Sequence, residues 1–297
     1  MLQHIKIPQS LECQRLFHGR GHAYPGYEHI CIDWFAPVIL ITAYKPIEPD
    51  LLTPLVEFLH TQVESCQSVQ LQHRYLSKSP IDCIWGEHLP AAIAQESGLK
   101  YHISLGQNQN HGLFLDMKNG RDWVKENSSG KVVLNLFAYT CAFSVAAIAG
   151  GADKVVNLDM SKAALRKGRE NHILNEQEMA EYAVRYEAVD LFKSFGRVKK
   201  HGPYDLVICD PPAFQKGSVN IERDYKKIIR RLPEFVNDHA QVLLCLNSPD
   251  LDVDFLTNTV AEYCPQLTYQ DTILPPAVFK EAYAGKGLKV LRFEFND

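Results

Sequence analysis

The C-terminal two thirds of the chain alternate short apolar runs with longer amphipathic segments. Strands are expected near residues 131–136, 154–158, 183–188, 204–209, 240–246, 267–273 and 287–295. Segments with helical spacing of apolar residues lie near 142–149, 161–175, 191–199, 222–237 and 252–263. Strands that alternate with helices predict an α/β fold in which a mostly parallel sheet carries helices on both faces. We therefore expect a Rossmann-like domain with a seven-stranded sheet.

The N-terminal part follows a different pattern. Short strands are expected near 13–18, 27–34, 37–44 and 68–74, with one helix near 50–64 that Pro49 opens. Glycine and proline turns separate the first two strands. A polar, glycine-flanked stretch at 106–112 indicates a linker. We expect a smaller α+β domain over 1–105, on the RNA or substrate side, and the larger domain over 106–297.

Composition excludes several classes of protein. The 297 residues are 46% hydrophobic and 22% charged, as in an ordinary soluble protein. No apolar stretch approaches a membrane span, and the polar start lacks the layout of a signal peptide, so we expect a cytoplasmic protein. The eight cysteines are scattered without a Cys-x-x-Cys pair, and we expect neither disulfides nor a metal site.

Charge is unevenly distributed. The net charge is −4, but residues 193–231 carry ten Lys or Arg against four acids. Within this segment the expected helix 222–237 has an apolar stripe and a basic stripe at spacings of three and four, the basic one formed by Arg223, Lys226, Lys227, Arg230 and Arg231. A local positive surface of this kind would steer an anionic polymer, although it could also be a merely solvated helix face.

The motif Asp210-Pro211-Pro212-Ala213-Phe214 directly follows the apolar run 206–209. An acid at the end of a buried strand, two prolines that cannot continue a helix or a ladder, and an aromatic ring would place a carboxylate, fixed carbonyls and a π-face at one rim. Such a rim is suited to holding a flat polar ring.

Further acids follow other expected strands. Asp159 lies 21 residues after Ala138, close to the spacing at which an acid receives ribose hydroxyls in nucleotide-binding units, and Asp190 could meet an adenine amino group. The loop that starts at Phe137 precedes a helix whose N-terminus carries free amides. The absence of Gly-x-Gly-x-x-Gly disfavours a dinucleotide dehydrogenase, because a pyrophosphate needs close backbone approach. S-adenosylmethionine carries no phosphate and tolerates a bulkier loop.

Several motifs spread over nearly the whole chain fit one family: 15–19, Pro25-Gly26, 32–34, 112–116, 135–140, 159–161, 210–214 and Leu288-Lys289. With these, the chain resembles the class I S-adenosylmethionine-dependent methyltransferases of bacterial 23S ribosomal RNA, in particular the group of cytosine carbon-5 and guanine nitrogen-7 enzymes. The resemblance implies an enzyme whose cofactor is S-adenosylmethionine. It implies cofactor contacts by Asn135, Phe137, Ala138, Tyr139, Thr140, Asp159, Met160, Asp190 and Asp210. It also implies that residues 210–214 face the methyl group and the base.

The chain departs from the family pattern at several places. Cys141 stands where the family usually has glycine after Tyr139-Thr140, so the cofactor loop is expected to be tighter or its affinity lower. The cytosine carbon-5 members carry a nucleophilic cysteine where this chain has Ser248. Carbon-5 of cytosine needs addition of a thiolate, whereas a purine nitrogen attacks the methyl directly. The basic N-terminal RNA-binding domain of some relatives is also expected to be absent.

We therefore expect methylation of a base nitrogen, guanine-like, in 23S ribosomal RNA or a ribosomal particle, by a monomer or homodimer. Asp210, Pro211, Pro212, Phe214 and Asn247 form the expected catalytic set, with Phe214 stacked on the target base. One alternative is a cytosine carbon-5 enzyme that uses Cys245 or Cys209 as nucleophile. A second alternative, of another class, is a catalytically silent RNA-binding or ribosome-assembly protein.

Overall fold

The computed structural model describes residues 1–297 except 107–108, 177–182, 213, 216–218 and 297. The chain forms two compact units. The first contains Met1–Lys118 and Pro276–Ala284, and the second contains Asn119–Pro275 and Gly285–Asp297. The sequence placed the division near residue 105, whereas the compact units divide after Lys118. A short segment from late in the chain also joins the first unit.

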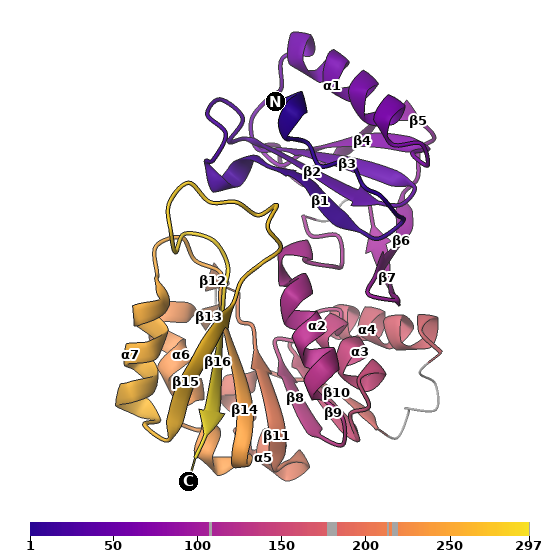
Figure 1. The fold of residues 1–297 in the computed structure, drawn as a ribbon. Helices are drawn as coiled ribbons and strands as arrows, with labels where there is room; N and C mark the ends of the chain where they lie inside the picture. Colours follow the sequence, from indigo (N-terminus) through magenta and orange to yellow (C-terminus); the bar gives the residue numbers. More distant parts are fainter. Residues whose placement is uncertain (107–108, 177–182, 213, 216–218, 297) are drawn as a thin grey trace. The chain divides into compact units, whose positions relative to one another are not determined.

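The second unit is built on a seven-stranded sheet of order β10-β9-β8-β11-β14-β16-β15 (Figure 1). Its strands are β8 (Val132–Leu136), β9 (Lys154–Asp159), β10 (Val184–Ala188), β11 (Tyr204–Cys209), β14 (Val236–Leu246), β15 (Leu267–Ile273) and β16 (Lys289–Phe295). The first five in this series are parallel, and β16 runs antiparallel between β14 and β15. The expected Rossmann-like α/β fold with seven strands is confirmed.

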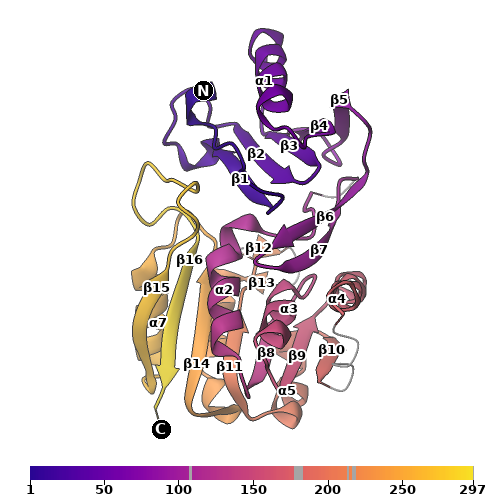
Figure 2. The same cartoon turned by 45° about the vertical axis from the view of Figure 1, so that its right-hand side comes forward.

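Helices cover both faces of this sheet. The helices are α2 (Lys118–Asn127), α3 (Ala142–Ala149), α4 (Lys162–Leu174), α5 (Phe195–His201), α6 (Ile221–Ile229) and α7 (Val253–Tyr263). The chain crosses from β10 to β11 on the opposite face, so α3 and α4 lie on one side and α5, α6 and α7 on the other (Figures 1 and 2). The main buried core joins Leu134 and Leu136 of β8 to Tyr225 and Ile228 of α6.

Two expected helices differ from the observed ones. The helix expected over 191–199 is divided into the 3-10 turn η5 (Leu191–Lys193) and α5. The helix expected over 222–237 ends at Ile229, and Leu232–Glu234 forms the 3-10 turn η6 before β14 begins at Val236. Pro233 cannot donate a helical hydrogen bond, which favours the break. Arg231 therefore lies outside α6.

The first unit has a five-stranded sheet of order β1-β2-β3-β4-β5. Its strands are β1 (Gln14–His18), β2 (Ile30–Phe35), β3 (Val38–Ala43), β4 (Ser68–His73) and β5 (Ile81–Gly86), and α1 (Pro49–Gln62) connects the parallel pair β3 and β4. A hairpin of β6 (Ala91–Glu96) and β7 (Leu99–Ser104) follows, and two 3-10 turns, η1 (Leu2–His4) and η3 (Leu115–Met117), lie near the ends of the segment. The short turn η2 (Gly19–Gly21) follows β1. In the described part of the chain no helix is long and apolar enough to cross a membrane.

Candidate active site

The carboxyl ends of five parallel strands meet at one edge of the seven-stranded sheet. Register places Leu136 of β8 beside Leu158 and Cys209, and Cys209 beside Leu244 of β14. Ala188 of β10 lies beside Asp159. The residues that follow these strands therefore gather at the same edge, where ligands of open α/β sheets bind. They include Phe137, Met160, Asp190, Asp210 and Asn247.

The loop between β8 and α3 has a strained backbone. Phe137, Tyr139 and Cys141 have positive φ angles of 58°, 47° and 59°. Residues other than glycine rarely adopt this region, and each such residue costs of order 1 kcal/mol or more. The turn is held because the Ala138 amide donates to the Leu158 carbonyl at 3.0 Å and the Cys141 amide donates to Ala138 at 2.7 Å. The loop is thus fixed against β9, with Ala138 and Thr140 buried.

Asp159 accepts hydrogen bonds from two backbone amides at this edge of the sheet. One carboxylate oxygen accepts from the Tyr139 amide at 2.9 Å and the other accepts from the Ser161 amide at 2.7 Å. The Ser161 hydroxyl in turn accepts from the Ala164 amide and caps α4. A carboxylate has about four acceptor positions, so two remain for hydroxyl donors of a ligand. The neighbouring Met160 side chain is exposed.

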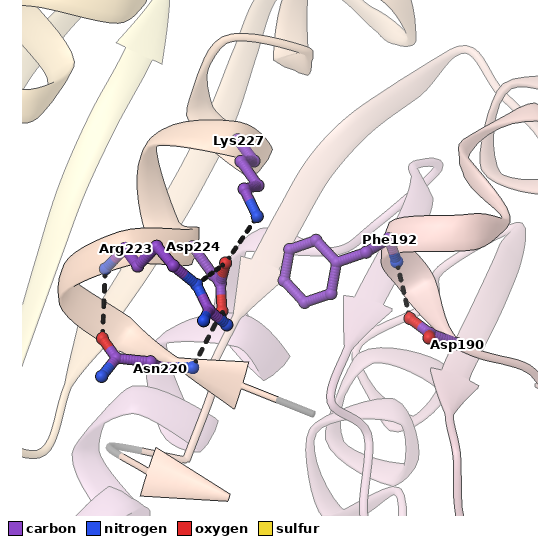
Figure 3. Close-up of polar contacts among 6 residues, drawn as sticks. All are labelled: Asp190, Phe192, Asn220, Arg223, Asp224 and Lys227. Carbon is purple, nitrogen blue, oxygen red and sulfur yellow. Dashed lines mark hydrogen bonds and ion pairs between the residues drawn. The ribbon is translucent and has the colours of Figure 1, made fainter. Parts of the chain in front are cut away.

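Asp190 has a similar arrangement at the end of β10. Its carboxylate accepts from the Phe192 amide at 2.9 Å (Figure 3). It also lies 3.6 Å from the ammonium of Lys193. The carboxylate therefore starts the η5 turn and keeps its remaining acceptor positions at the sheet edge. Phe192 extends towards α6, where the Lys227 ammonium lies 5.7 Å from its ring centroid.

Asn135 lies in a different environment from the other expected cofactor residues. Its buried amide nitrogen donates to Asn157 of β9 at 2.9 Å, and Asn157 donates to the Ser144 hydroxyl of α3 at 2.9 Å. The same hydroxyl lies 2.9 Å from Nε2 of His172 on α4. Asn135 thus belongs to a polar chain between the sheet and its helices, one layer below the strand ends.

The Asp210 motif follows β11 directly. The chain leaves the sheet at Asp210, Pro211 is buried and Pro212 is exposed. Below the motif, the hydroxyl of Tyr225 on α6 lies 3.1 Å from the Cys209 carbonyl oxygen and 2.9 Å from that of Cys245. These contacts join α6 to the carboxyl ends of β11 and β14. Ala213 lies outside the described residues, and Phe214 is described only by its backbone pairing with Asn220 in the ribbon β12 (Phe214–Gln215) and β13 (Val219–Asn220).

Asn247 is exposed at the end of β14, beside the strand that carries Asp210. The next residue, Ser248, is held by Lys289, whose ammonium donates to the carbonyl oxygens of Ser248, Gly285 and Gly287 at 2.9, 2.6 and 2.8 Å. Lys289 is only 3% exposed, so these hydrogen bonds offset the burial of its charge. The strand end next to Asp210 is therefore fixed by a buried cation.

Both cysteines of the cytosine alternative are buried in the sheet. Cys209 and Cys245 sit within β11 and β14 with no solvent exposure. Burial raises the pKa of the Cys209 thiol well above its ordinary value, so the thiolate is scarce at neutral pH. Both residues have the environment of core thiols.

The basic residues of the α6 region are not equivalent. Asp224, only 2% exposed, accepts from Arg223 at 2.7 Å, from Lys227 at 2.8 Å and from the Asn220 amide at 2.9 Å (Figure 3). Arg231 pairs with Glu234 at 3.0 Å. Lys226 and Arg230 have no ion pair among the described residues, and Lys226 lies 5.9 Å from the Tyr263 ring centroid. The positive charge available to a ligand is therefore smaller than the sequence indicates.

Three residues of this site were missed by sequence reasoning as position-setting groups: Tyr225, Asp224 and Lys289. The signal for Asp224 was present, because an acid one residue after Arg223 and three before Lys227 is at ion-pair spacing on a helix. The contacts of Tyr225 and Lys289 join segments far apart in the sequence, and no local pattern indicates them.

The hydrogen-bond acceptors at this edge fit a nucleoside with hydroxyl and amino donors and without a phosphate. Asp159 and Asp190 keep acceptor positions free, and the loop 137–141 contains no basic residue. Within the described residues no group of three or more metal-ligating side chains is assembled.

Comparison with known proteins identifies the family to which the chain belongs. Residues 14–294 match the model of the S-adenosylmethionine-dependent methyltransferase family, and the chain belongs to that family. Membership confirms the expected class of enzyme and its cofactor, S-adenosylmethionine.

Curated relatives add detail. The chain is similar to a ribosomal RNA large subunit methyltransferase of Deinococcus radiodurans, with 30% identity over 226 residues that cover 72% of this chain and 54% of the relative. It is 28% identical to ribosomal RNA large subunit methyltransferase I of Aeromonas hydrophila over 231 residues, covering 74% and 57%. The chain thus spans little more than half the length of these two relatives.

A solved structure described as an S-adenosylmethionine-dependent methyltransferase from Streptococcus mutans superimposes with a TM-score of 0.84 and 24% identity, covering 96% of this chain and 76% of that chain. At this identity the likeness shows the fold.

Proposed function

We propose that this protein methylates a base nitrogen, guanine-like, in 23S ribosomal RNA, in the cytoplasm. The observation that carries the proposal is the placement of Asp210 and Asn247 at adjacent strand ends, with Asp210 one strand from the loop 137–141 and two strands from Asp159. A carboxylate and an amide at the same end of the sheet as Asp159 and Asp190 can form hydrogen bonds with the polar edge of a base. The curated relatives, named as ribosomal RNA large subunit methyltransferases, support RNA as the partner.

Bound S-adenosylmethionine supplies an electrophilic methyl group on a sulfonium. In this proposal Asp159 accepts the ribose hydroxyls, Asp190 accepts from the adenine amino group, and the strained loop 137–141 holds the cofactor rigidly. Asp210 accepts a hydrogen bond from the base edge and orients a nitrogen lone pair towards the methyl. As the nitrogen–carbon bond forms, the sulfur–carbon bond breaks and its electron pair stays on sulfur.

Nitrogen is favoured over carbon-5 because the chain has Ser248 at the position of the expected thiol and buries Cys209 and Cys245. Nitrogen alkylation needs orientation and a dry site, whereas carbon-5 methylation needs an accessible thiolate.

The test is methylation of protein-free and ribosome-bound 23S ribosomal RNA with S-adenosylmethionine labelled in the methyl group, followed by mass spectrometry of the nucleosides. A labelled guanine nitrogen supports the proposal. A labelled 5-methylcytosine, or a covalent adduct with RNA that contains 5-fluorocytosine, would establish the cytosine alternative. Tight cofactor binding without methylation of either RNA form would leave the silent RNA-binding protein as the better account.

A further inference from the structure

One end of the five-stranded sheet of the first unit brings cations and an aromatic ring together. Arg20 lies in η2 directly after β1. Tyr44 and Arg74 follow the last residues of the parallel strands β3 and β4, which pair at Ala43 and His73. The Arg74 amide donates to the Ala43 carbonyl at 2.8 Å, and the Tyr44 amide donates to His29 at 2.8 Å. Backbone pairing therefore fixes the positions of Tyr44 and Arg74.

The guanidinium groups of Arg20 and Arg74 both lie near the ring of Tyr44. The guanidinium carbon of Arg20 lies 4.2 Å from the Tyr44 ring centroid, and that of Arg74 lies 5.8 Å from it. The two guanidinium carbons are therefore at most about 10 Å apart, which is about one Debye length at 0.1 M salt. Two cations at this separation repel one another through solvent. The half-buried tyrosine holds them together by cation–π attraction.

Several described groups around this cluster are neutral or already paired. Arg15, which also acts on the Tyr44 hydroxyl, is bound to Asp33 at 2.5 Å. Burial and the neighbouring Arg15 and Arg20 lower the pKa of His18 to about 3, so that histidine is neutral. Neither Arg20 nor Arg74 has a carboxylate partner among the described residues, and Arg74 donates to the backbone oxygen of Gln109.

Nearby acids face histidines. Glu281 lies 3.5 Å from His18, and Asp82 lies 2.9 Å from His73. Arg20 is exposed, whereas Tyr44 and Arg74 are half-buried. An exposed guanidinium that already lies over an aromatic face, next to a second one without a counter-ion in the described part of the chain, is arranged to receive an oxyanion in two or more hydrogen bonds.

We propose that Arg20, Tyr44 and Arg74 form a phosphate-binding site for RNA in the first unit, in addition to the α6 region. The proposal rests on the proposed function, which makes RNA the anionic polymer that the protein meets. RNA is favoured over an acidic polypeptide because the guanidinium fork matches phosphate and because an exposed arginine plane also stacks on bases.

The test measures binding of in-vitro-transcribed 23S ribosomal RNA by filter retention between about 50 and 200 mM salt. Each phosphate contact contributes about 0.7 to 0.9 to the slope of log affinity against log salt. The double variant Arg20→Gln/Arg74→Gln should therefore lose about 1.4 to 1.8 from this slope. Affinity at low salt should fall about ten-fold or more, while calorimetric binding of S-adenosylmethionine stays unchanged.

The matched control is Lys6→Gln/Lys100→Gln, which removes the same charge from the same unit and should leave the slope nearly intact. Arg20→Gln alone, at an exposed position, gives the same sign of change if the double variant does not fold. A slope equal to that of the wild type, or an equal loss in the control, overturns the proposal. The proposal is also overturned if the double variant loses binding to poly-glutamate while its binding to RNA is unchanged. The wild type could bind RNA through Arg20 and Arg74 and still fail to methylate it. That result would count against the proposed function but not against the phosphate-binding site.

Discussion

Cys141, in the loop 137–141, is accommodated by the glycine at position 168 of α4. A Cβ built on Gly168 would overlap the Cys141 sulfur and would lie 2.8 Å from the Cys141 Cβ. Cys141 itself has a φ of 59° and ψ of 29°, a conformation that glycine adopts without strain. The loop thus keeps the backbone shape of a glycine, and the side chain that departs from the family pattern occupies space left by Gly168.

Gly168→Ala should destabilise the fold by about 1 to 3 kcal/mol, because a methyl group would enter occupied space. It should also weaken S-adenosylmethionine binding, since Cys141 can move only with the loop. Urea unfolding and calorimetry measure the two effects. In the double variant Cys141→Gly/Gly168→Ala the methyl group has room, and a favourable coupling of about 1 kcal/mol is expected. Gly196→Ala, in α5 with nothing within 4 Å of its added Cβ, is the control and should be neutral or slightly stabilising.

Asp159→Ala should weaken S-adenosylmethionine binding by about 1 to 3 kcal/mol, because it removes the proposed hydrogen bonds to the ligand and the one to the Tyr139 amide. Asp159→Asn, which keeps the size of the side chain, should have a smaller effect. Calorimetry on folded variants decides, and unchanged affinity in Asp159→Ala would remove the residue from the site.

Asp210→Ala or Phe214→Ala should lower turnover by about a hundred-fold or more while cofactor affinity stays nearly constant, because their proposed contacts are with the base. Cys209→Ala and Cys245→Ala should keep most activity, apart from the stability cost of small cavities in the core. Single-turnover methylation of RNA compares the variants. Loss of activity in either folded cysteine variant would contradict methylation of nitrogen.

Lys226→Gln/Arg230→Gln should reduce the salt dependence of RNA binding by about 0.7 to 0.9 for each phosphate that the variant no longer neutralises. Arg223→Gln/Lys227→Gln should affect RNA binding less, because these cations already pair with Asp224. It should instead lower the free energy of unfolding. Equal changes in the salt dependence of RNA binding for the two double variants would contradict this. They would show that cations paired with Asp224 bind RNA as well as unpaired ones.

The free energy of unfolding should depend on pH through Asp224. Hydrogen bonds from Arg223 and Lys227 hold the pKa of its carboxyl well below the ordinary value. A depressed pKa in the folded state gives stability that is present above the ordinary pKa of about 4 and is lost as the pH falls further. Asp224→Asn should lose about 1 to 3 kcal/mol at pH 7, since both partner cations are partly exposed and regain water. Its stability should then fall less steeply below pH of about 4 than that of the wild type.

Local pattern determined most of the larger unit. All seven strands of its sheet were predicted within a few residues, and the inner parallel strands β8, β9 and β11 are the clearest because they are mostly buried and apolar. The acids at the ends of β9 and β11 were identifiable for the same reason, and Asp190 because it follows the expected strand near 183–188. The hairpin β6–β7 was missed because its alternation of small and polar residues, as in Ala92 and Gln95, is weak.

Tertiary structure alone decided how these residues are used. Asn135 shares a motif with the loop 137–141, yet strand alternation turns its side chain into a buried polar chain with Asn157 and Ser144. The basic residues near α6 look alike in sequence, but Arg223 and Lys227 pair with the buried Asp224, whereas Lys226 has no ion pair among the described residues. Gly168 and Cys141 are far apart in the chain and meet only when α4 packs on the loop. Periodicity records which face of a segment is buried, whereas partners depend on three-dimensional packing.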